Sequence, residues 1–290
     1  MTELPLIWPA PAKLNLLLHI TGQRADGYHE LQTVFQFLDY GDELRFEPRP
    51  DTKVQRVQNI EGIPAEEDLV VRAAKALQQT CACQQGVDIY LDKKLPMGAG
   101  LGGGSSDAAT TLHALNHLWA CGLDNDELAE IGLKLGADVP VFVHGFSAFA
   151  EGIGEQLTPI ELDQPWYLVI TPDIHVSTAA IFGDLELTRD CPAIKICGLP
   201  DSGWDNVCLP VVTRHYPKVA EALEILGQYA EARMSGTGAS VFAAFETEVE
   251  AKRVRTSLRE STKAAMPESW KDFIAKGVNT SPLHEQLNSL

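Results

Sequence analysis

The chain has few basic residues for its length. Lysine and arginine together number 23 against 40 aspartates and glutamates in 290 residues, which gives a net charge of −17. A surface of this sign repels nucleic acid and anionic membranes, so we expect neither as a partner. An anionic ligand would need local attraction, from backbone N–H groups or from a few placed cations.

Long hydrophobic runs are missing as well. No segment reaches the roughly 18 continuous apolar residues of a membrane helix. The N-terminus lacks a basic start, and Pro5, Pro9 and Pro11 interrupt its apolar residues, so we predict no signal peptide. The expectation is a cytoplasmic protein, a monomer or weak homodimer, whose partners are small molecules.

Cysteine is present but lacks the spacing of a metal or disulfide site. None of the six forms a C-x-x-C pair, and no histidine cluster accompanies them. This pattern argues against structural zinc and against a disulfide framework, so we expect reduced, mostly packed thiols. The six are Cys81, Cys83, Cys121, Cys191, Cys197 and Cys208.

Strand and helix patterns alternate in both halves of the chain, which predicts an α/β or α+β class. The length favours two domains, and we place the boundary before a strand pattern near residue 168, giving 1–160 and 161–290. A capping-box pattern at Asp124 and Glu127 predicts a helix start. A single helix is predicted over about 213–231. The spacing of four apolar residues predicts another, at Ala108, Leu112, Leu115 and Trp119.

One glycine-rich stretch lies between a predicted strand and that last helix. Residues 95–109 read LPMGAGLGGGSSDAA. Glycines can turn successive N–H groups inward, and Ser105 and Ser106 would open a helix whose first N–H groups are unpaired. The stretch therefore predicts an anion site suited to a di- or triphosphate. No lysine follows its last glycine, which excludes the common P-loop, and a dinucleotide G-x-G-x-x-G fits poorly. A flexible hinge is the alternative.

The stretch resembles the phosphate-binding motif P-x-x-x-G-L-G-S/G-S-S of the GHMP kinases, which include galactokinase, homoserine kinase and mevalonate kinase. In that family, backbone amides and a helix N-terminus hold the phosphates of ATP. The resemblance implies a two-domain fold, with an N-terminal domain like domain 2 of ribosomal protein S5 and a ferredoxin-like α+β C-terminal domain. The matching residues are Pro96, Met97, Gly98, Ala99, Gly100, Leu101, Gly102, Gly103, Gly104, Ser105 and Ser106.

Further stretches resemble one branch of this family, whose members phosphorylate a cytidine diphosphate ester. They are residues 10–44, which contain RADGYHEL, residues 136–155 and residues 233–245. The resemblance implies ATP-dependent transfer of a phosphoryl group to the 2-hydroxyl of a methylerythritol unit, in the non-mevalonate isoprenoid pathway. Mg²⁺ is expected to bridge the ATP phosphates. No D-x-D or similar carboxylate pair indicates its ligands, so we assign none.

Two charged residues stand out by their positions. Lys13 lies in an apolar strand pattern, where it either extends to the surface or meets an anion. Asp138 follows Gly136 and precedes Pro140, so it either caps the next helix or faces a cleft. The resemblance implies that both are catalytic: Asp138 removes the hydroxyl proton or positions the hydroxyl, and Lys13 keeps Asp138 ionised.

Aromatic and polar residues predict how a substrate with a base would be held. Tyr28 and His29 combine a π surface with hydrogen-bonding groups. The resemblance implies that cytosine stacks on Tyr28 and on a second aromatic, for which we choose Phe182, while His29 reads the base. Core packing is the alternative for Phe182. Asn15 projects from the same strand face as Lys13 and should face the methylerythritol hydroxyls.

Two other functions stay open from the sequence. One is a kinase for another alcohol, such as mevalonate or homoserine, although Tyr28 and His29 would then have no base to stack on. The other is a nucleotide-binding regulator without chemistry, which has no need of a hydroxyl-activating pair.

The family commonly has asparagine where this chain has Asp68, and an ionised aspartate cannot donate a hydrogen bond to adenine or ribose.

Overall fold

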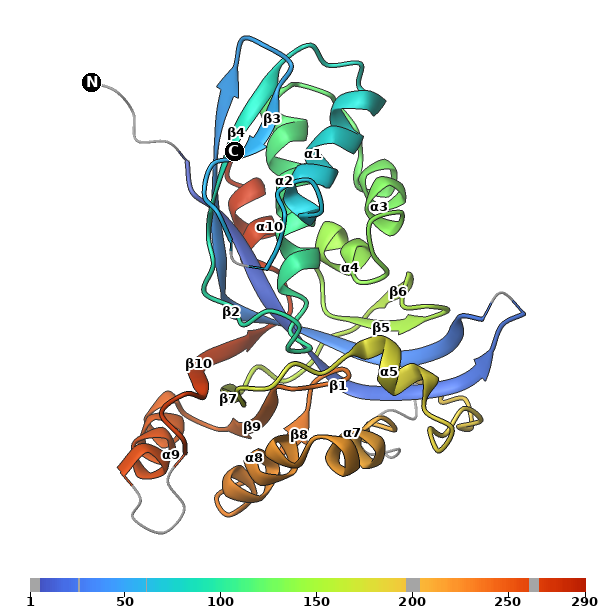
Figure 1. The fold of residues 1–290 in the computed structure, drawn as a ribbon, viewed down its shortest axis with the longest axis vertical. Helices are drawn as coiled ribbons and strands as arrows, with labels where there is room; N and C mark the ends of the chain where they lie inside the picture. The colour runs from blue at the N-terminus through green and yellow to red at the C-terminus, as the bar shows by residue number, and fades with distance from the viewer. Residues whose placement is uncertain (1–5, 26, 61, 197–203, 261–265) are drawn as a thin grey trace.

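A long antiparallel hairpin organises the fold. The computed structural model describes residues 6–25, 27–60, 62–196, 204–260 and 266–290. The hairpin consists of β1 (Trp8–Gln23) and β2 (His29–Arg49), and β1 is buried along most of its length. Figure 1 shows it passing between an upper body that contains α1 to α4 and a lower body that contains α7 to α9.

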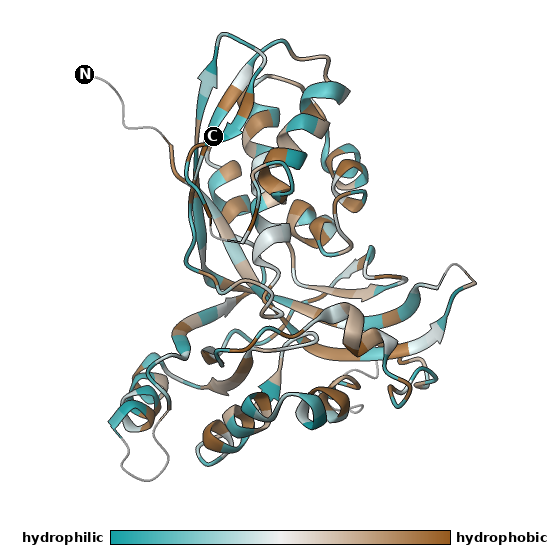
Figure 2. Cartoon of the chain, in the orientation of Figure 1, coloured by the Kyte–Doolittle hydropathy of each residue, from teal (hydrophilic) through white to brown (hydrophobic). Residues whose placement is uncertain are grey.

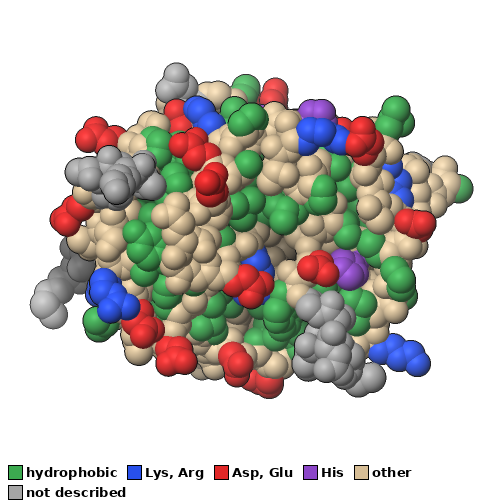
Figure 3. Space-filling view, turned by 90° about the horizontal axis from the view of Figure 1, so that it is seen from below, with side chains coloured by type: hydrophobic (Ala, Val, Ile, Leu, Met, Phe, Trp, Pro, Cys, Tyr) green, Lys and Arg blue, Asp and Glu red, His purple; other side chains and the backbone are tan. Residues whose placement is uncertain are grey.

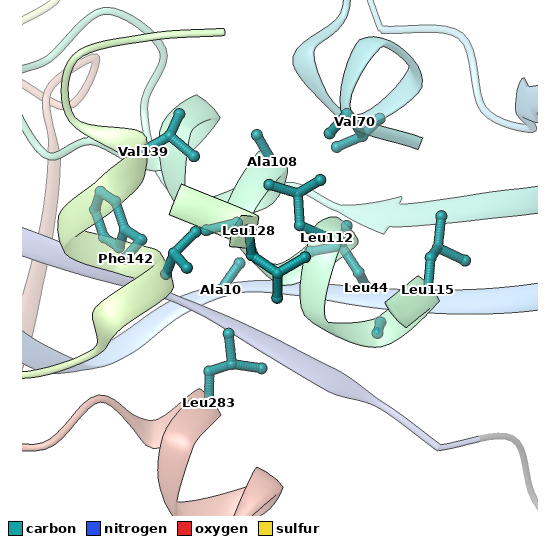
Figure 4. Close-up of a cluster of buried hydrophobic side chains, with 14 of the residues drawn as sticks. Ala10, Leu44, Val70, Ala108, Leu112, Leu115, Leu128, Val139, Phe142 and Leu283 are labelled. Atoms are coloured by element: carbon teal, nitrogen blue, oxygen red, sulfur yellow. The ribbon is translucent and has the colours of Figure 1, made fainter. Parts of the chain in front are cut away.

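The upper body joins the hairpin to helices through one hydrophobic core. Strand β2 pairs with β4 and β5, and β4 pairs in parallel with β3. Figure 4 shows side chains from α1 to α4 and from α10 meeting the strands in this core. The elements are β3 (Val54–Arg56), α1 (Leu69–Thr80), β4 (Gly86–Asp92), α2 (Gly103–Leu118), α3 (Asn125–Leu133), α4 (Val139–His144), β5 (Ala148–Glu151), β6 (Gln156–Pro159) and α10 (Pro282–Leu287).

The lower body is an antiparallel sheet with helices packed against it. Its strand order is β10-β7-β9-β8, and the end of β10 pairs with β2, which joins the two bodies. Figure 2 shows that α7 and α8 carry both hydrophobic and hydrophilic residues, as expected of helices with one face on a core. The elements are β7 (Trp166–Thr171), α5 (Thr178–Gly183), α7 (Leu209–His215), α8 (Pro217–Gly227), β8 (Arg233–Met234), β9 (Val241–Phe245), α9 (Glu248–Glu260) and β10 (Lys271–Val278).

The prediction of one helix over 213–231 is wrong. The chain forms α7 and α8 instead, and they meet at Tyr216, whose φ of −125° and ψ of 78° are not helical. Pro217 explains the break, because proline lacks the N–H that a continuous helix needs and disfavours helical geometry in the residue before it. The capping box at Asp124 and Glu127 is confirmed at the start of α3.

The two bodies exchange segments. Leu18 and Ile20 of β1 pack in the lower core, whereas Leu283 of α10 packs in the upper one. A third cluster, which includes Leu14 and Phe273, lies between them. The division at residues 160 and 161 stays a prediction, and the exchange means that each core draws on residues from both sides of that point.

The acidic surface agrees with the negative net charge, and the described cysteines are free, as their spacing predicts. On the face shown in Figure 3, acidic side chains are scattered around the edge and near the middle rather than collected in one patch. No helix among the described residues is long and apolar enough to cross a membrane. Five of the cysteines are described, and none of these five forms a disulfide. Cys197 lies outside the described residues.

Two histidines hold the end of α4. His113 of α2 and His284 of α10 each donate from Nε2 to the carbonyl oxygen of Val143, at 2.9 and 2.8 Å. Their rings meet edge to face, with centroids 5.0 Å apart. Burial, with a smaller contribution from the neighbouring His284, lowers the pKa of His113 to about 4.

This burial predicts a loss of stability in acid. The unfolded chain binds a proton at the ordinary histidine pKa of about 6.5, whereas folded His113 resists it down to about 4, so the free energy of unfolding falls as the pH drops through that window. We expect His113→Gln, which keeps a donor for Val143, to reduce the fall between pH 7 and pH 5 by about 2 kcal/mol. Urea unfolding of both proteins at the two pH values measures the difference. Equal falls would contradict a buried neutral His113.

Candidate active site

A cavity of about 990 Å³ brings the predicted site residues together. Its wall combines residues of β1 and β2 with the glycine loop, the N-cap of α4 and one face of α5. Of the residues singled out from the sequence, only Ser106 does not line it, because its side chain is buried. Those that do are Lys13, Asn15, Tyr28, His29, Asp138, Phe182 and residues 96–105.

The glycine loop has the open backbone that the sequence predicts. Gly98, Gly100 and Gly102 have φ values of 62°, 77° and 72°, a left-handed conformation that suits glycine. Helix α2 begins at Gly103, two residues before the predicted start at Ser105, so both serines lie in its first turn. Gly103, Gly104 and Ser105 at this helix start line the same cavity as the loop, an arrangement that is typical of phosphate sites.

Lys13 meets an anion and does not extend to the surface. Its side chain is only 3% exposed. The ammonium group lies 2.5 Å from Asn15 Oδ1, 3.3 Å from the carbonyl oxygen of Gly100 and 3.3 Å from Asp138 Oδ2. The contacts to Asn15 and Gly100 are hydrogen bonds, and the contact to Asp138 is an ion pair. The buried charge is therefore compensated.

Asp138 faces the cavity, although it holds the N-cap position of α4. Its carboxylate makes no capping hydrogen bond to the helix and is 37% exposed. The alternative that the side chain caps α4 is therefore excluded, and the carboxylate points toward Lys13. A half-exposed carboxylate beside a buried ammonium group has the chemistry needed to bind and deprotonate a hydroxyl.

A hydrogen-bond network holds Lys13 against the glycine loop. Asn15 donates from Nδ2 to Thr33 Oγ1 at 2.8 Å, which fixes the amide oxygen toward Lys13. The backbone N–H of Asn15 donates to Ser235 Oγ at 3.1 Å, and Ser235 donates in turn to the Gly100 carbonyl at 2.8 Å. The network thus joins β1, the glycine loop and the loop before β9.

Asn206, which sequence reasoning missed, hydrogen-bonds to the loop before β9. Asn206 donates from Nδ2 to the carbonyl of Gly236 at 2.8 Å. Thr237 bonds through its hydroxyl to Thr178 of α5 at 2.9 Å. Gly236 and Thr237 line the cavity. An isolated asparagine in a loop has no pattern that would have indicated this contact.

Lys93 is a second cation at the cavity that sequence reasoning missed. It forms ion pairs with buried Asp42 and with Asp107, the latter at 2.7 Å. Burial disfavours its charge, yet Asp107 and Asp42 outweigh burial and raise the pKa of Lys93. Burial raises the pKa of Asp107 to about 8, although Lys93 opposes this. The adjacent lysines Lys93 and Lys94, just before the glycine loop, were the sequence pattern that could have indicated this cation.

The side chain of Asp68 caps the start of α1. Its carboxylate accepts a hydrogen bond from the backbone N–H of Val70 at 3.0 Å and forms a buried ion pair with Arg56. It lines the cavity, but its charge is balanced by the arginine and by the start of the helix. This explains how aspartate is accommodated where the family commonly has asparagine.

Aromatic residues form another part of the wall. The rings of His29 and Phe182 stack, with centroids 5.1 Å apart and an angle of 25° between planes. Phe182 also packs against the lower core, so it takes part in both the packing and the cavity. Tyr28 is 61% exposed and lines the same cavity. Burial and the charge of Arg189 lower the pKa of His29, which favours a neutral imidazole.

Comparisons with known proteins agree with this architecture. The family models for the GHMP kinases N terminal domain and the GHMP kinases C terminal domain match residues 68–146 and 199–264. A homoserine kinase from Cytophaga hutchinsonii shares the fold, with a TM-score of 0.68 at 16% identity, over 95% of this chain and 94% of that one. The chain belongs to the GHMP kinases.

Full-length relatives indicate which kind of GHMP kinase the chain resembles. The 4-diphosphocytidyl-2-C-methyl-D-erythritol kinase of Pseudomonas syringae pv. syringae is 54% identical over all 290 residues, which cover the whole of both chains. That of Pseudomonas paraeruginosa is 56% identical over 282 residues, 97% of each. A crystal structure of 4-(cytidine 5'-diphospho)-2C-methyl-D-erythritol kinase matches with a TM-score of 0.79 at 31% identity, over 94% of this chain and 99% of that one. Within the family, the chain groups with the 4-diphosphocytidyl-2-C-methyl-D-erythritol kinases.

The glycine loop can be tested with a matched pair of alanine variants. A Cβ on Gly102 would lie 2.6 Å from the ring of Phe142, whereas one on Gly122, which has a similar φ of 73°, would meet nothing within 4 Å. Both changes should cost about 1–2 kcal/mol of stability through the left-handed backbone. Only Gly102→Ala should also weaken ATP binding, by at least about tenfold, because the loop must shift. Calorimetric titration with ATP measures this, and equal affinities in the two variants would contradict it.

Proposed function

We propose that this chain transfers the γ-phosphoryl group of ATP to the 2-hydroxyl of 4-diphosphocytidyl-2-C-methyl-D-erythritol, giving the 2-phosphate and ADP. This reaction belongs to the non-mevalonate pathway to isoprenoid precursors. Full-length similarity to relatives of that name supports the proposal. The observation that carries it is the pairing of Lys13 with Asp138 in one cavity with the glycine loop.

In this proposal, the glycine loop and the start of α2 hold the phosphates of ATP. Asp138 accepts a hydrogen bond from the 2-hydroxyl and takes its proton as the oxygen attacks the γ-phosphorus and the bond to the ADP oxygen breaks. Lys13 forms an ion pair with the Asp138 carboxylate and fixes its direction. Because Lys13 also contacts the Gly100 carbonyl, it sets the distance between the acceptor side and the phosphate side.

Mg²⁺ fits this site as an ion that arrives with the ATP phosphates. Among the described residues, no group of three or more His, Cys, Asp or Glu side chains would hold it alone. Magnesium commonly takes one or two protein oxygens and completes its shell with phosphate and water. Ser105 lines the cavity, whereas Ser106 is buried outside it, so Ser105 is the serine that would supply an oxygen. When bound, the ion neutralises charge on the transferring phosphoryl group.

The aromatic part of the cavity would take the cytidine. Cytosine stacks between Tyr28 and Phe182, and His29 hydrogen-bonds to its edge. Asn15 is held toward Lys13, beside the place where the methylerythritol hydroxyls would lie. The division into an ATP-binding domain of residues 1–160 and a second domain of residues 161–290 belongs to the same proposal, as do the small-molecule substrates of a cytoplasmic enzyme.

The role of Asp138 predicts a separation of binding from turnover. Asp138→Asn should bind ATP normally but release ADP at least about 100-fold more slowly, because the amide cannot accept the proton. The assay mixes protein, magnesium, ATP and the cytidine diphosphate ester and follows ADP. Asp126→Asn, which removes an exposed carboxylate of α3, is the matched control. Turnover of Asp138→Asn at the control rate would remove Asp138 from the mechanism, and no ADP from the unaltered chain would refute the proposed function.

The role of Tyr28 predicts a difference between the two substrates. Tyr28→Ala should raise the KM for the cytidine diphosphate ester by about tenfold or more, since base stacking on an aromatic contributes about 1–3 kcal/mol. The KM for ATP should change little. Tyr229→Ala removes an exposed tyrosine outside the cavity and serves as the control. Equal losses for both substrates would contradict a stacking role.

A further inference from the structure

Arg189 lies behind the aromatic wall of the cavity and hydrogen-bonds to both residues that stack there, His29 and Phe182. Its Nε donates to His29 Nε2 at 3.1 Å. One terminal nitrogen donates to the carbonyl oxygens of Phe182 and Asp184, at 2.8 and 2.7 Å, and the other to that of Leu187 at 3.0 Å. Arg189 itself does not line the cavity. A single guanidinium group therefore joins the β1–β2 hairpin to the segment that carries Phe182.

This contact decides which nitrogen of His29 carries the proton. A guanidinium group has only donors and stays protonated, so His29 Nε2 must accept the hydrogen bond. In a neutral imidazole the single proton then lies on Nδ1. The only polar ring atom left for a ligand is thus a donor. The stacking of the ring on Phe182, whose carbonyl is bound by the same guanidinium, restricts its rotation.

We propose that Arg189 is a positioning residue, which makes His29 a hydrogen-bond donor toward the base and thereby favours cytosine over uracil. The inference rests on the proposed function. Cytosine presents an unprotonated N3 that accepts a hydrogen bond, whereas uracil carries a proton at N3 and opposes a second donor. A donor that is left facing another donor loses its hydrogen bond, which is how polar sites reject a close analogue.

The charges around His29 agree with this assignment. Arg189 faces the ring from the second half of the chain, and the ion pair of Arg24 with Glu30 lies on its own hairpin. The carboxylate of Asp184 is bound by Arg214 and His215. Of these groups, Arg189 is the one in hydrogen-bond contact with the ring. Burial and this positive charge both lower the pKa of His29 and so preserve the neutral form at neutral pH.

The first test uses the whole protein without substrate. Long-range proton–nitrogen correlation spectra of protein labelled with ¹⁵N-histidine, at pH 7.5, distinguish the two neutral tautomers, and His29→Gln identifies the signal. We expect His29 to be neutral with the proton on Nδ1. A proton on Nε2, or a doubly protonated ring, would overturn the proposal. This readout needs no turnover, so its failure is separate from a failure of the proposed function.

The second test compares two arginine variants. Arg189→Met should raise the KM for the cytidine ester by about 10- to 100-fold, the loss expected for one hydrogen bond that involves a charged group, with little change in the KM for ATP. Its preference for the cytidine over the uridine ester should fall by a similar factor. Arg189→Lys, which keeps a cation and a donor, should recover part of both. Arg214→Met removes a cation that binds Asp184 but touches neither His29 nor Phe182, and it should leave both values unchanged.

The pH dependence separates positioning from mere support of the fold. In Arg189→Met, the neutral imidazole is no longer held in one tautomer, and the pKa of His29 should rise toward its ordinary value of about 6.5. Protonation places a donor on Nδ1 again, so the KM for the cytidine ester should decrease as the pH falls from 8 to 6. The unaltered protein should show a smaller change over that range, because its neutral imidazole already carries the proton on Nδ1. Parallel pH profiles, or equal losses for ester and ATP, would contradict the proposal.

Discussion

The buried ammonium group of Lys13 is the interaction on which the cavity depends. Removing a charge from water costs several kcal/mol, and the cost is offset only when the charge is paired and fully hydrogen-bonded. Lys13 obtains two hydrogen-bond acceptors, from its own strand and from the glycine loop, and an ion-pair partner at the start of α4. These segments are distant in the chain, so the need to satisfy one charge holds them at a fixed separation.

Close backbone contact is the second constraint. Gly100 approaches the loop before β9 so closely that a Cβ at this position would lie 2.2 Å from the carbonyl oxygen of Ser235. Glycine is therefore required here by packing as well as by backbone conformation. The contact joins the upper and lower bodies next to Lys13, where Ser235 and Asn15 complete the network. The phosphate side of the cavity is thus supported from both bodies.

The cavity is lined by two different kinds of group. At the glycine loop, an open backbone leads into a helix start, which is typical of phosphate sites and needs no P-loop lysine. At the aromatic wall, side chains make the contacts, and their hydrogen-bonding character depends on what lies behind them. Arg189 behind His29 is an example. A substrate that carries both phosphate and a base needs both kinds of group.

Local patterns in the sequence were sufficient to predict the glycine loop, the helix after it and the capping box at Asp124, because these depend on residues within a few positions of one another. Sequence periodicity failed at Pro217, where one residue divides a predicted helix, and it placed the start of α2 two residues late. Resemblance singled out Lys13 and Asp138, but each had a structural alternative. Only the tertiary structure excluded these two alternatives, because burial of Lys13 and the direction of Asp138 arise from contacts between distant segments that no local pattern encodes.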